Sequence, residues 1–279
     1  MVNNKYSQQV PINRSKNRER VGMMAYGLLR RVNWLTNHNR FADQYSEPLA
    51  YVQCSHQTPL LRQLKDVDMK YQYNKITNLR IAAKKLDGIV IHPGEVFSYW
   101  KLIGNPTKKK GYLEGMVLHN GQVGFGIGGG LCQLSNLIYW TALHSPLTVV
   151  ERHRHGYDVF PDLDRTQPFG SGATCCYPHI DLMLQNNTTC DFQLSIQVGD
   201  EFLTGAWHTD APPLFQYEIV EKNHRIVAEY WGGYTRCNEL YRRTYDLNGN
   251  LLPEEKVAEN NATMMYAPFI ESPVFPHTP

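Results

Sequence analysis

A cysteine that follows three consecutive glycines is the most chemically suggestive feature of this sequence. Residues 121–135 read GQVGFGIGGGLCQLS, and an apolar segment begins directly after the three glycines. Glycine accepts positive φ angles and allows close approach to the backbone. At a helix start, free N–H groups and the positive end of the helix dipole lower the pKa of a thiol. Cys132 is therefore a candidate nucleophile, with Gln133 and backbone N–H groups as oxyanion donors.

A base for such a nucleophile is available in the segment Glu151-Arg-His-Arg-His155. If this segment is extended, His153 and His155 face one way because side chains alternate along a strand. A following strand would carry His179 and Asp181 on one face. A cysteine on a helix, a histidine on a strand and a polar residue on the next strand is the order of papain-like and transglutaminase-like thiol enzymes.

Three other interpretations of the same residues stay open. The glycine loop with Arg152 and Arg154 could hold a carboxylate or a phosphate without catalysis. Cys132, His153 and His155 could ligate a metal, although the cysteine spacing does not favour one. A glycine turn and an inert buried cysteine are also common purely structural features.

The predicted site is the following set. The candidate catalytic residues are Cys132, His153, His155, Asp181 and Gln133, and the candidate ligand-binding residues are Gly128, Gly129, Gly130, Ser135, Arg152 and Arg154. No cofactor and no metal are predicted. The enzyme class that fits is a cysteine-dependent hydrolase or acyl transferase, and the residues leave open whether the site catalyses or only binds.

The elements that must position these residues follow from periodicity. Apolar residues recur at helical spacing over 15–34, 76–86 and 131–144, and strands are expected at 89–91, 147–153 and 173–184. Beyond residue 191 the pattern is almost entirely β, and Asn248-Gly249-Asn250 predicts a hairpin.

Helices followed by a run of strands predict an α+β fold with a mostly antiparallel sheet. The central helix that carries Cys132 should pack on that sheet, with a helical N-terminal part and a β-rich C-terminal part. We expect three parts: a helical extension over 1–75, a core domain over 76–190 and a β-rich segment over 191–279 that packs on the core.

Composition and charge exclude several classes of protein. A net charge of +2 argues against a general nucleic-acid binder. No apolar run resembles a signal peptide or a membrane span, which predicts a cytoplasmic protein. The first 40 residues carry eight basic residues and one acid. The helix at 15–34 could therefore rest on an anionic membrane, although a solvated helix on the domain is favoured.

The motifs resemble those of the VanW family. The resemblance rests on Pro93-Gly-Glu-Val-Phe-Ser98, Gly128-Gly-Gly-Leu-Cys-Gln-Leu-Ser135, Glu151-Arg-His-Arg-His155, Asp181-Leu with Asn186-Asn187, and a weaker match over 234–242 and 259–260. Many members of the family carry an acid where this chain has Gly172. If that acid orients a catalytic histidine in those members, Asp181 or Asp158 would have to replace it here.

The resemblance implies a setting and not a reaction. It implies an accessory protein of glycopeptide (vancomycin) resistance, in which precursors ending in D-Ala-D-Ala are replaced by precursors ending in D-Ala-D-lactate. The expected ligand is then a cell-wall precursor or a related peptide. The biochemical activity of the family is not defined, so the site residues stand on their own chemistry.

Overall fold

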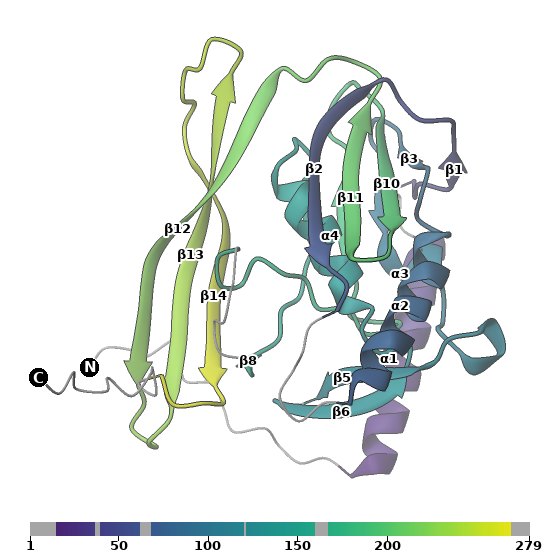
Figure 1. Ribbon diagram of the computed structural model, residues 1–279, viewed down its shortest axis with the longest axis vertical. Coiled ribbons are helices and arrows are strands. Elements are labelled where there is room, and N and C mark those ends of the chain that lie inside the picture. Colours follow the sequence, from purple (N-terminus) through teal and green to yellow (C-terminus); the bar gives the residue numbers. More distant parts are fainter. Residues whose placement is uncertain (1–14, 37–39, 62–67, 120, 160–166, 269–279) are drawn as a thin grey trace, which may run out of the picture.

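A computed structural model describes residues 15–36, 40–61, 68–119, 121–159 and 167–268 of the chain (Figure 1). The fold is α+β with mainly antiparallel sheets, as the sequence pattern predicts. The helices are α1 (Lys16–Thr36), α2 (Met69–Ala83), α3 (Tyr99–Ile103) and α4 (Cys132–Leu143). The strands are β1 (Gln44–Tyr45), β2 (Tyr51–Pro59), β3 (Ile89–Ile91), β4 (Val96–Ser98), β5 (Glu114–His119), β6 (Gln122–Ile127), β7 (Thr148–Glu151), β8 (Tyr157–Asp158), β9 (Met183–Gln185), β10 (Phe192–Val198), β11 (Phe202–Thr209), β12 (Phe215–Ala228), β13 (Tyr234–Asp246) and β14 (Glu255–Met264).

The main core lies between α4, α2 and a five-stranded sheet with the order β1-β3-β10-β11-β2. The stripe that the periodicity of α4 predicts is buried: Leu131, Leu134, Ile138 and Ala142 all belong to this core. The helix approaches the sheet closely, since a Cβ at Gly205 of β11 would lie 2.9 Å from Leu137. The apolar face of α4 therefore fixes where its polar side chains point.

The C-terminal strands form a separate sheet beside this body (Figure 1). Its order is β12-β13-β14-β8, and β8 pairs with β14 in parallel. The predicted turn at 248–250 does join β13 to β14, and the Asp246 carboxylate accepts hydrogen bonds from the N–H groups of Asn248 and Asn250. Two smaller sheets, β4-β9-β7 and the hairpin β5-β6, complete the described part of the chain.

Two strand predictions that bear on the site are wrong in their extent. The strand after α4 ends at Glu151, so the segment 152–156 is irregular and the two histidines do not share a strand face. The strand expected over 173–184 is only β9, at residues 183–185. Before β9 the chain makes a tight turn in which Cys176 and Ile180 exchange backbone hydrogen bonds around a cis Tyr177-Pro178 bond. Side-chain alternation cannot be applied to such a turn.

The three expected parts of the chain contribute to one sheet. Strand β2 comes from the first 75 residues, β3 from the middle of the chain, and β10 and β11 from beyond residue 190. The expected helical extension thus also holds two strands that pair into the sheet. Within the described residues, no helix is both long and apolar enough to cross a bilayer.

Candidate functional site

The glycine loop before α4 is shaped by close backbone contact. A Cβ at Gly129 would lie 2.2 Å from the carbonyl of Gly115 in β5, and the Gly129 carbonyl accepts a hydrogen bond of 3.0 Å from the side-chain amide of Asn78 in α2. Gly128 and Gly130 have φ angles of 77° and 89°. These contacts explain the glycines without any ligand.

Cys132 begins α4, as the sequence predicts, but its surroundings raise the pKa of the thiol. The half-buried Sγ lies 3.6 Å from the Cys175 carbonyl, to which it donates. Burial raises the thiol pKa, a hydrogen bond to Cys175 opposes this, and the nearby Cys176 raises it further. In addition, N–H groups of the first turn donate to the carbonyls of Gly130 and Leu131. The expected lowering of the pKa at the helix start is therefore absent.

The two polar neighbours of Cys132 hold the fold together. The Gln133 amide donates to Thr58 Oγ1 at 3.0 Å and to the Pro59 carbonyl at 2.8 Å, at the end of β2. The buried Ser135 hydroxyl donates to the Ala173 carbonyl at 2.7 Å. In this geometry Gln133 is committed to β2 and is not placed as an oxyanion donor.

Both arginines of the Glu-Arg-His-Arg-His segment are committed to internal partners. Arg152 donates to the Gly172 carbonyl at 2.7 Å and to Asn260 Oδ1 at 3.2 Å, and it lies over the Tyr139 ring. Arg154 donates to the Asn261 carbonyl. Burial lowers both pKa values, that of Arg154 to about 10 with a further contribution from Arg152. These guanidinium groups link the core to β14 instead of facing an anion.

The two histidines are not hydrogen-bonded to the thiol. His153 is exposed, and its Nε2 lies 3.1 Å from Glu151 Oε1. His155 is half-buried, and burial together with the Arg154 charge lowers its pKa. The sequence predicted that these histidines act with Cys132, but in the structure His153 pairs with the Glu151 carboxylate of its own segment.

The buried carboxylate of Asp181 accepts hydrogen bonds from residues at the start of α3. It accepts hydrogen bonds from Ser98 Oγ at 2.6 Å and from the N–H groups of Trp100 and Leu182 at 2.9 Å. Burial raises its pKa to about 6, although the hydrogen bonds from Ser98 and Trp100 oppose the increase. Asp158, the alternative orienting acid, accepts from Tyr266 Oη at 2.9 Å. Neither carboxylate is hydrogen-bonded to His153 in the described structure.

Glu151 is the residue whose importance the motif did not reveal. Its carboxylate pairs with both Nη atoms of Arg30 in α1, at 2.5 and 2.8 Å, and also accepts from the Asp181 N–H. Burial would raise its pKa, but the hydrogen bonds from His153 and Arg30 outweigh it and lower the pKa to about 2. Arg30 lies 121 residues earlier in the chain, and no sequence signal links the two.

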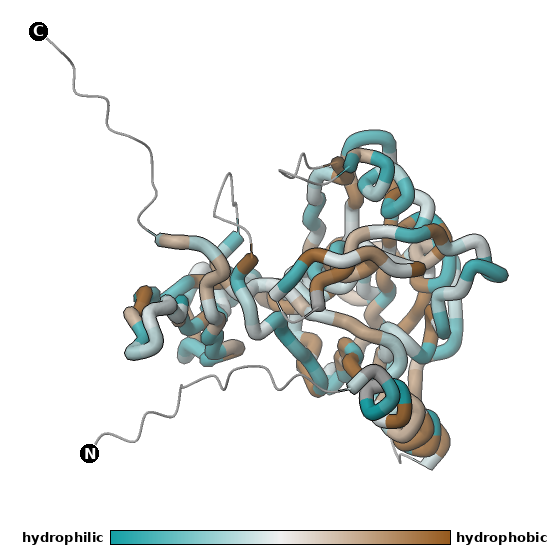
Figure 2. The backbone as a smooth tube through the Cα atoms, turned by 90° about the horizontal axis from the view of Figure 1, so that it is seen from below, coloured by the Kyte–Doolittle hydropathy of each residue, from teal (hydrophilic) through white to brown (hydrophobic). Residues whose placement is uncertain are grey.

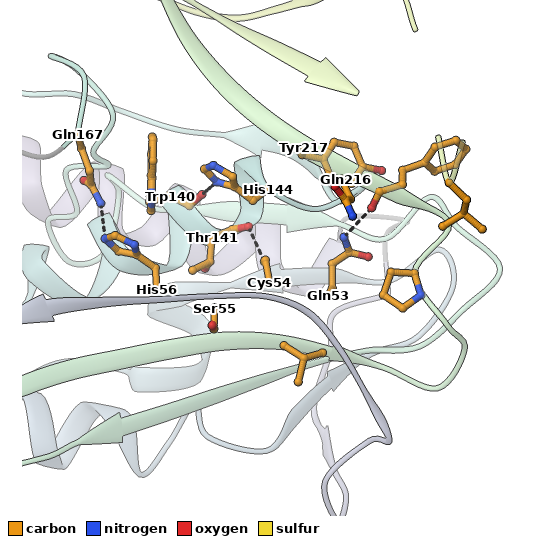
Figure 3. A pocket seen from close by; sticks show the side chains of 14 residues that line it. Gln53, Cys54, Ser55, His56, Trp140, Thr141, His144, Gln167, Gln216 and Tyr217 are labelled. Atoms are coloured by element: carbon orange, nitrogen blue, oxygen red, sulfur yellow. Dashed lines mark hydrogen bonds between the residues drawn. The ribbon is translucent and has the colours of Figure 1, made fainter. Parts of the chain in front are cut away.

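A cleft of about 580 Å³ opens at the other end of α4, between β2 and β12 (Figure 3). Sequence reasoning did not predict it, because its walls come from distant segments. It is lined by Val52, Gln53, Cys54, Ser55, His56, Trp140, Thr141, His144, Gln167, Pro213, Phe215, Gln216, Tyr217 and Leu247. Its volume falls within the range of about 300–1,000 Å³ that is common for ligand sites.

Three rings form the inner part of this cleft (Figure 3). Trp140 contacts His56 and His144 edge to face, with centroid distances of 6.0 and 4.6 Å. The side-chain amide of Gln167 lies 2.8 Å from His56 Nε2, and His144 Nδ1 lies 2.9 Å from the Trp140 carbonyl. These contacts leave aromatic surface beside amide groups that can both donate and accept.

The lining of the cleft is uncharged at neutral pH. None of the lining residues, all of which are described, is Asp, Glu, Lys or Arg. Burial lowers the pKa of His56 and of His144, and burial raises the pKa of the Cys54 thiol to about 12. The cleft therefore suits an uncharged ligand better than an ionic one, because no described lining side chain would supply a counter-charge to replace lost hydration.

The described residues contain no group of three or more His, Cys, Asp or Glu side chains arranged to hold a metal ion. In particular, His153 faces Glu151, and the Cys132 thiol faces the Cys175 carbonyl.

Comparison with known proteins identifies relatives of the part of the chain that contains the glycine–cysteine loop and the Glu-Arg-His-Arg-His segment. A family model described as VanW like protein matches residues 74–208. The Vancomycin B-type resistance protein VanW of Enterococcus faecalis is 39% identical over 167 residues, which cover 60% of this chain and 61% of that protein. The uncharacterized protein YoaR of Bacillus subtilis is 32% identical over 109 residues, 39% of this chain and 34% of that protein.

The chain thus spans about three fifths of the first relative's length and a third of the second's. No solved structure matches it. The glycine–cysteine loop, the Glu-Arg-His-Arg-His segment and the sheet strands β10 and β11 fall within the matched region or at its edge, and in this region the chain is similar to the VanW family.

Proposed function

We propose that the protein is a non-catalytic accessory factor of glycopeptide resistance that binds an uncharged part of a cell-wall precursor or a related peptide. The resistance setting is supported by the relative that is named a vancomycin B-type resistance protein. The binding role is supported by the cleft between α4, β2 and β12.

The observation that carries the proposal is the contrast between two ends of α4. At its start, Cys132 has a raised pKa and its polar neighbour Gln133 is hydrogen-bonded within the fold. At its end, Trp140 and His144 border an open cleft. Nucleophilic catalysis needs a thiolate and a base within hydrogen-bond reach, whereas binding needs shape and a few polar groups.

The chemistry of the cleft supports one class of ligand. The Trp140 ring offers dispersion contact to the C–H face of a sugar ring or to a peptide plane. The side chains of Gln53, Gln167 and Gln216 offer amide donors and acceptors to hydroxyl or amide groups. Saccharide and peptide-amide groups carry both kinds of surface without a net charge.

A direct test measures binding of uncharged probes to the full chain. N,N′-diacetylchitobiose and N-acetyl-alanyl-alanine amide are added at about 10 mM, which reaches weak affinities, and saturation transfer to each is recorded by NMR. We expect transfer to at least one of them and a weakening of about tenfold in Trp140→Ala. Trp231→Ala, which removes a partly exposed indole outside the cleft, is the matched control.

Gln216→Ala serves as a second variant, because Gln216 is exposed and its loss does not disturb the core. The absence of transfer to both probes, or equal transfer in the wild type and both cleft variants, would contradict the proposal.

A resistance assay separates binding from cysteine chemistry. In a strain whose vancomycin resistance depends on this protein, Trp140→Ala should lower resistance, and Cys132→Ser should leave it unchanged. If Cys132→Ser abolishes resistance while probe binding and folding persist, the protein acts through the thiol and the non-catalytic proposal is wrong.

A further inference from the structure

Helix α1 is attached to the body along one side only. Gly27 is buried there, and a Cβ at this position would lie 3.0 Å from Pro178 Cγ. On the same side, Arg30 pairs with Glu151, and Trp34 packs against the core. At 100° per residue these three positions lie within one face of the helix. Contacts with the body therefore explain these three positions.

The opposite face of α1 is apolar and exposed. We call it the outer stripe, and it consists of Val21, Met24, Ala25, Leu28, Val32 and Leu35. The five large side chains of the stripe are between 46% and 85% exposed. Their spacing of three and four residues places them within an arc of about 100°. Figure 2 shows the helix at the edge of the body, with hydrophobic residues along it.

Basic residues accompany the outer stripe. The helix sequence contains Lys16, Arg18, Arg20, Arg30 and Arg31 against the single acid Glu19. Only Arg30 among the described side chains turns inward to an ion pair, while Arg18, Arg20 and Arg31 are exposed. An apolar arc flanked by cations is the pattern of helices that lie in a membrane interface.

Charge decides which occupant the stripe fits. A second copy of the chain would bring another helix of net positive charge against this one, and the like charges would repel. An anionic lipid surface provides both an apolar phase for the stripe and negative headgroups for the arginines.

We propose that the outer stripe of α1 docks on the surface of an anionic lipid bilayer, with the helix lying parallel to the membrane. Val21, Leu28 and Leu35 would enter the interface between headgroups and acyl chains, and the exposed arginines would contact the headgroups. This inference is independent of the cleft and of the proposed ligand.

Vesicle sedimentation with the full chain tests the proposal. The vesicles contain equal parts of phosphatidylglycerol and phosphatidylcholine, or phosphatidylcholine alone. We expect the protein to pellet with the anionic vesicles, and the double variant Leu28→Ser/Val32→Ser to bind them at least about tenfold more weakly, since each exposed apolar side chain contributes to insertion. Leu214→Ser/Leu251→Ser, which changes two exposed leucines outside α1 and outside the cleft lining, should bind like the wild type.

Substitution of the exposed arginines provides a second test. Arg18→Ser/Arg31→Ser should weaken binding to anionic vesicles and leave the low binding to neutral vesicles unchanged. Circular dichroism should show that all variants fold, because every substituted side chain is exposed. Equal pelleting of the wild type and the stripe variant would overturn the proposal. Dimerisation in sedimentation equilibrium that the stripe variant abolishes would also overturn it, in favour of a second copy.

Discussion

The pair of Glu151 and Arg30 fastens α1 to the rest of the protein, so we expect Glu151→Gln to release this helix. Glu151 Oε1 and Oε2 each contact one Nη atom of Arg30, and Arg30 also donates to the His179 carbonyl at 2.8 Å. The substitution keeps the size of the side chain and removes only its charge. Arg30 is then left partly buried without a counter-charge, while Gly27 and Trp34 still contact the body.

The burial of the pair sets the size of the effect. The side chains of Arg30 and Glu151 are 13% and 21% exposed. Breaking a fully buried pair costs about 3–5 kcal/mol, whereas an exposed pair contributes about 0.2–1 kcal/mol. This bidentate and mostly buried pair lies between these limits, so we expect a loss of about 2 kcal/mol. That free energy corresponds to about a 30-fold increase in the opening of α1.

Amide hydrogen exchange measures this opening segment by segment. Exchange in the α1 residues 27–33 should accelerate about 30-fold in Glu151→Gln, while exchange in α4 should stay unchanged. Arg30→Met should accelerate α1 to a similar extent, and the double variant should add little. Arg31→Gln is the matched control, since Arg31 is the exposed neighbour of Arg30. Unchanged exchange in α1 would refute the role of the pair.

The same pair predicts a pH dependence. The Glu151 pKa is lowered to about 2, so its stabilisation is present above the usual carboxyl range and is lost as the pH falls from about 4.5 to 2. Exchange in α1 should therefore accelerate over this window in the wild type, relative to the intrinsic rate, and stay flat in Glu151→Gln.

Three further predictions concern the residues around α4. Asp181→Asn should fold and gain stability relative to the wild type as the pH rises from 4 to 7, because the raised pKa of about 6 means that ionising Asp181 opposes folding. Asp181→Ala should instead lower the free energy of unfolding in urea by about 1–3 kcal/mol, since three donors lose their acceptor. Gly129→Ala should destabilise the protein by more than about 2 kcal/mol, because its Cβ would meet the Gly115 backbone. Gly124→Ala should cost less in the same assay, because its Cβ would make only an ordinary contact with Val117 at 3.7 Å. Alkylation of Cys132 by iodoacetamide at pH 7 should be slower than that of a free model thiol, because burial raises its pKa; faster labelling would mean that the thiol is activated.

The sequence alone was sufficient for several of the elements and for the resemblance to the VanW family. The apolar spacing of Leu131, Leu134, Ile138 and Ala142 predicted α4 and its buried face, and the turn signal at 248–250 predicted the hairpin between β13 and β14. These features are local, since a helix or hairpin is encoded by residues within a few positions of each other. The VanW motifs are equally local and were recognisable without a structure.

The tertiary structure decided what the polar residues of those motifs do. Gln133 and Arg152 were candidates for catalysis and ligand binding, but β2 and the loop before Ala173 lie beside them and take their hydrogen bonds. The chemical type of a side chain limits what it can contact without selecting its partner. Partner choice follows from how distant segments pack, as Arg30 and Glu151 show across 121 residues.

The cleft is the clearest case of this dependence. Its walls combine β2, the end of α4 and the beginning of β12, which lie in distant parts of the sequence and belong to different sheets or to none. Trp140, His56 and Tyr217 belong to no motif and share no spacing. Local periodicity records which side of an element is buried, whereas an open cavity arises where packed elements leave space, and that depends on all of them at once.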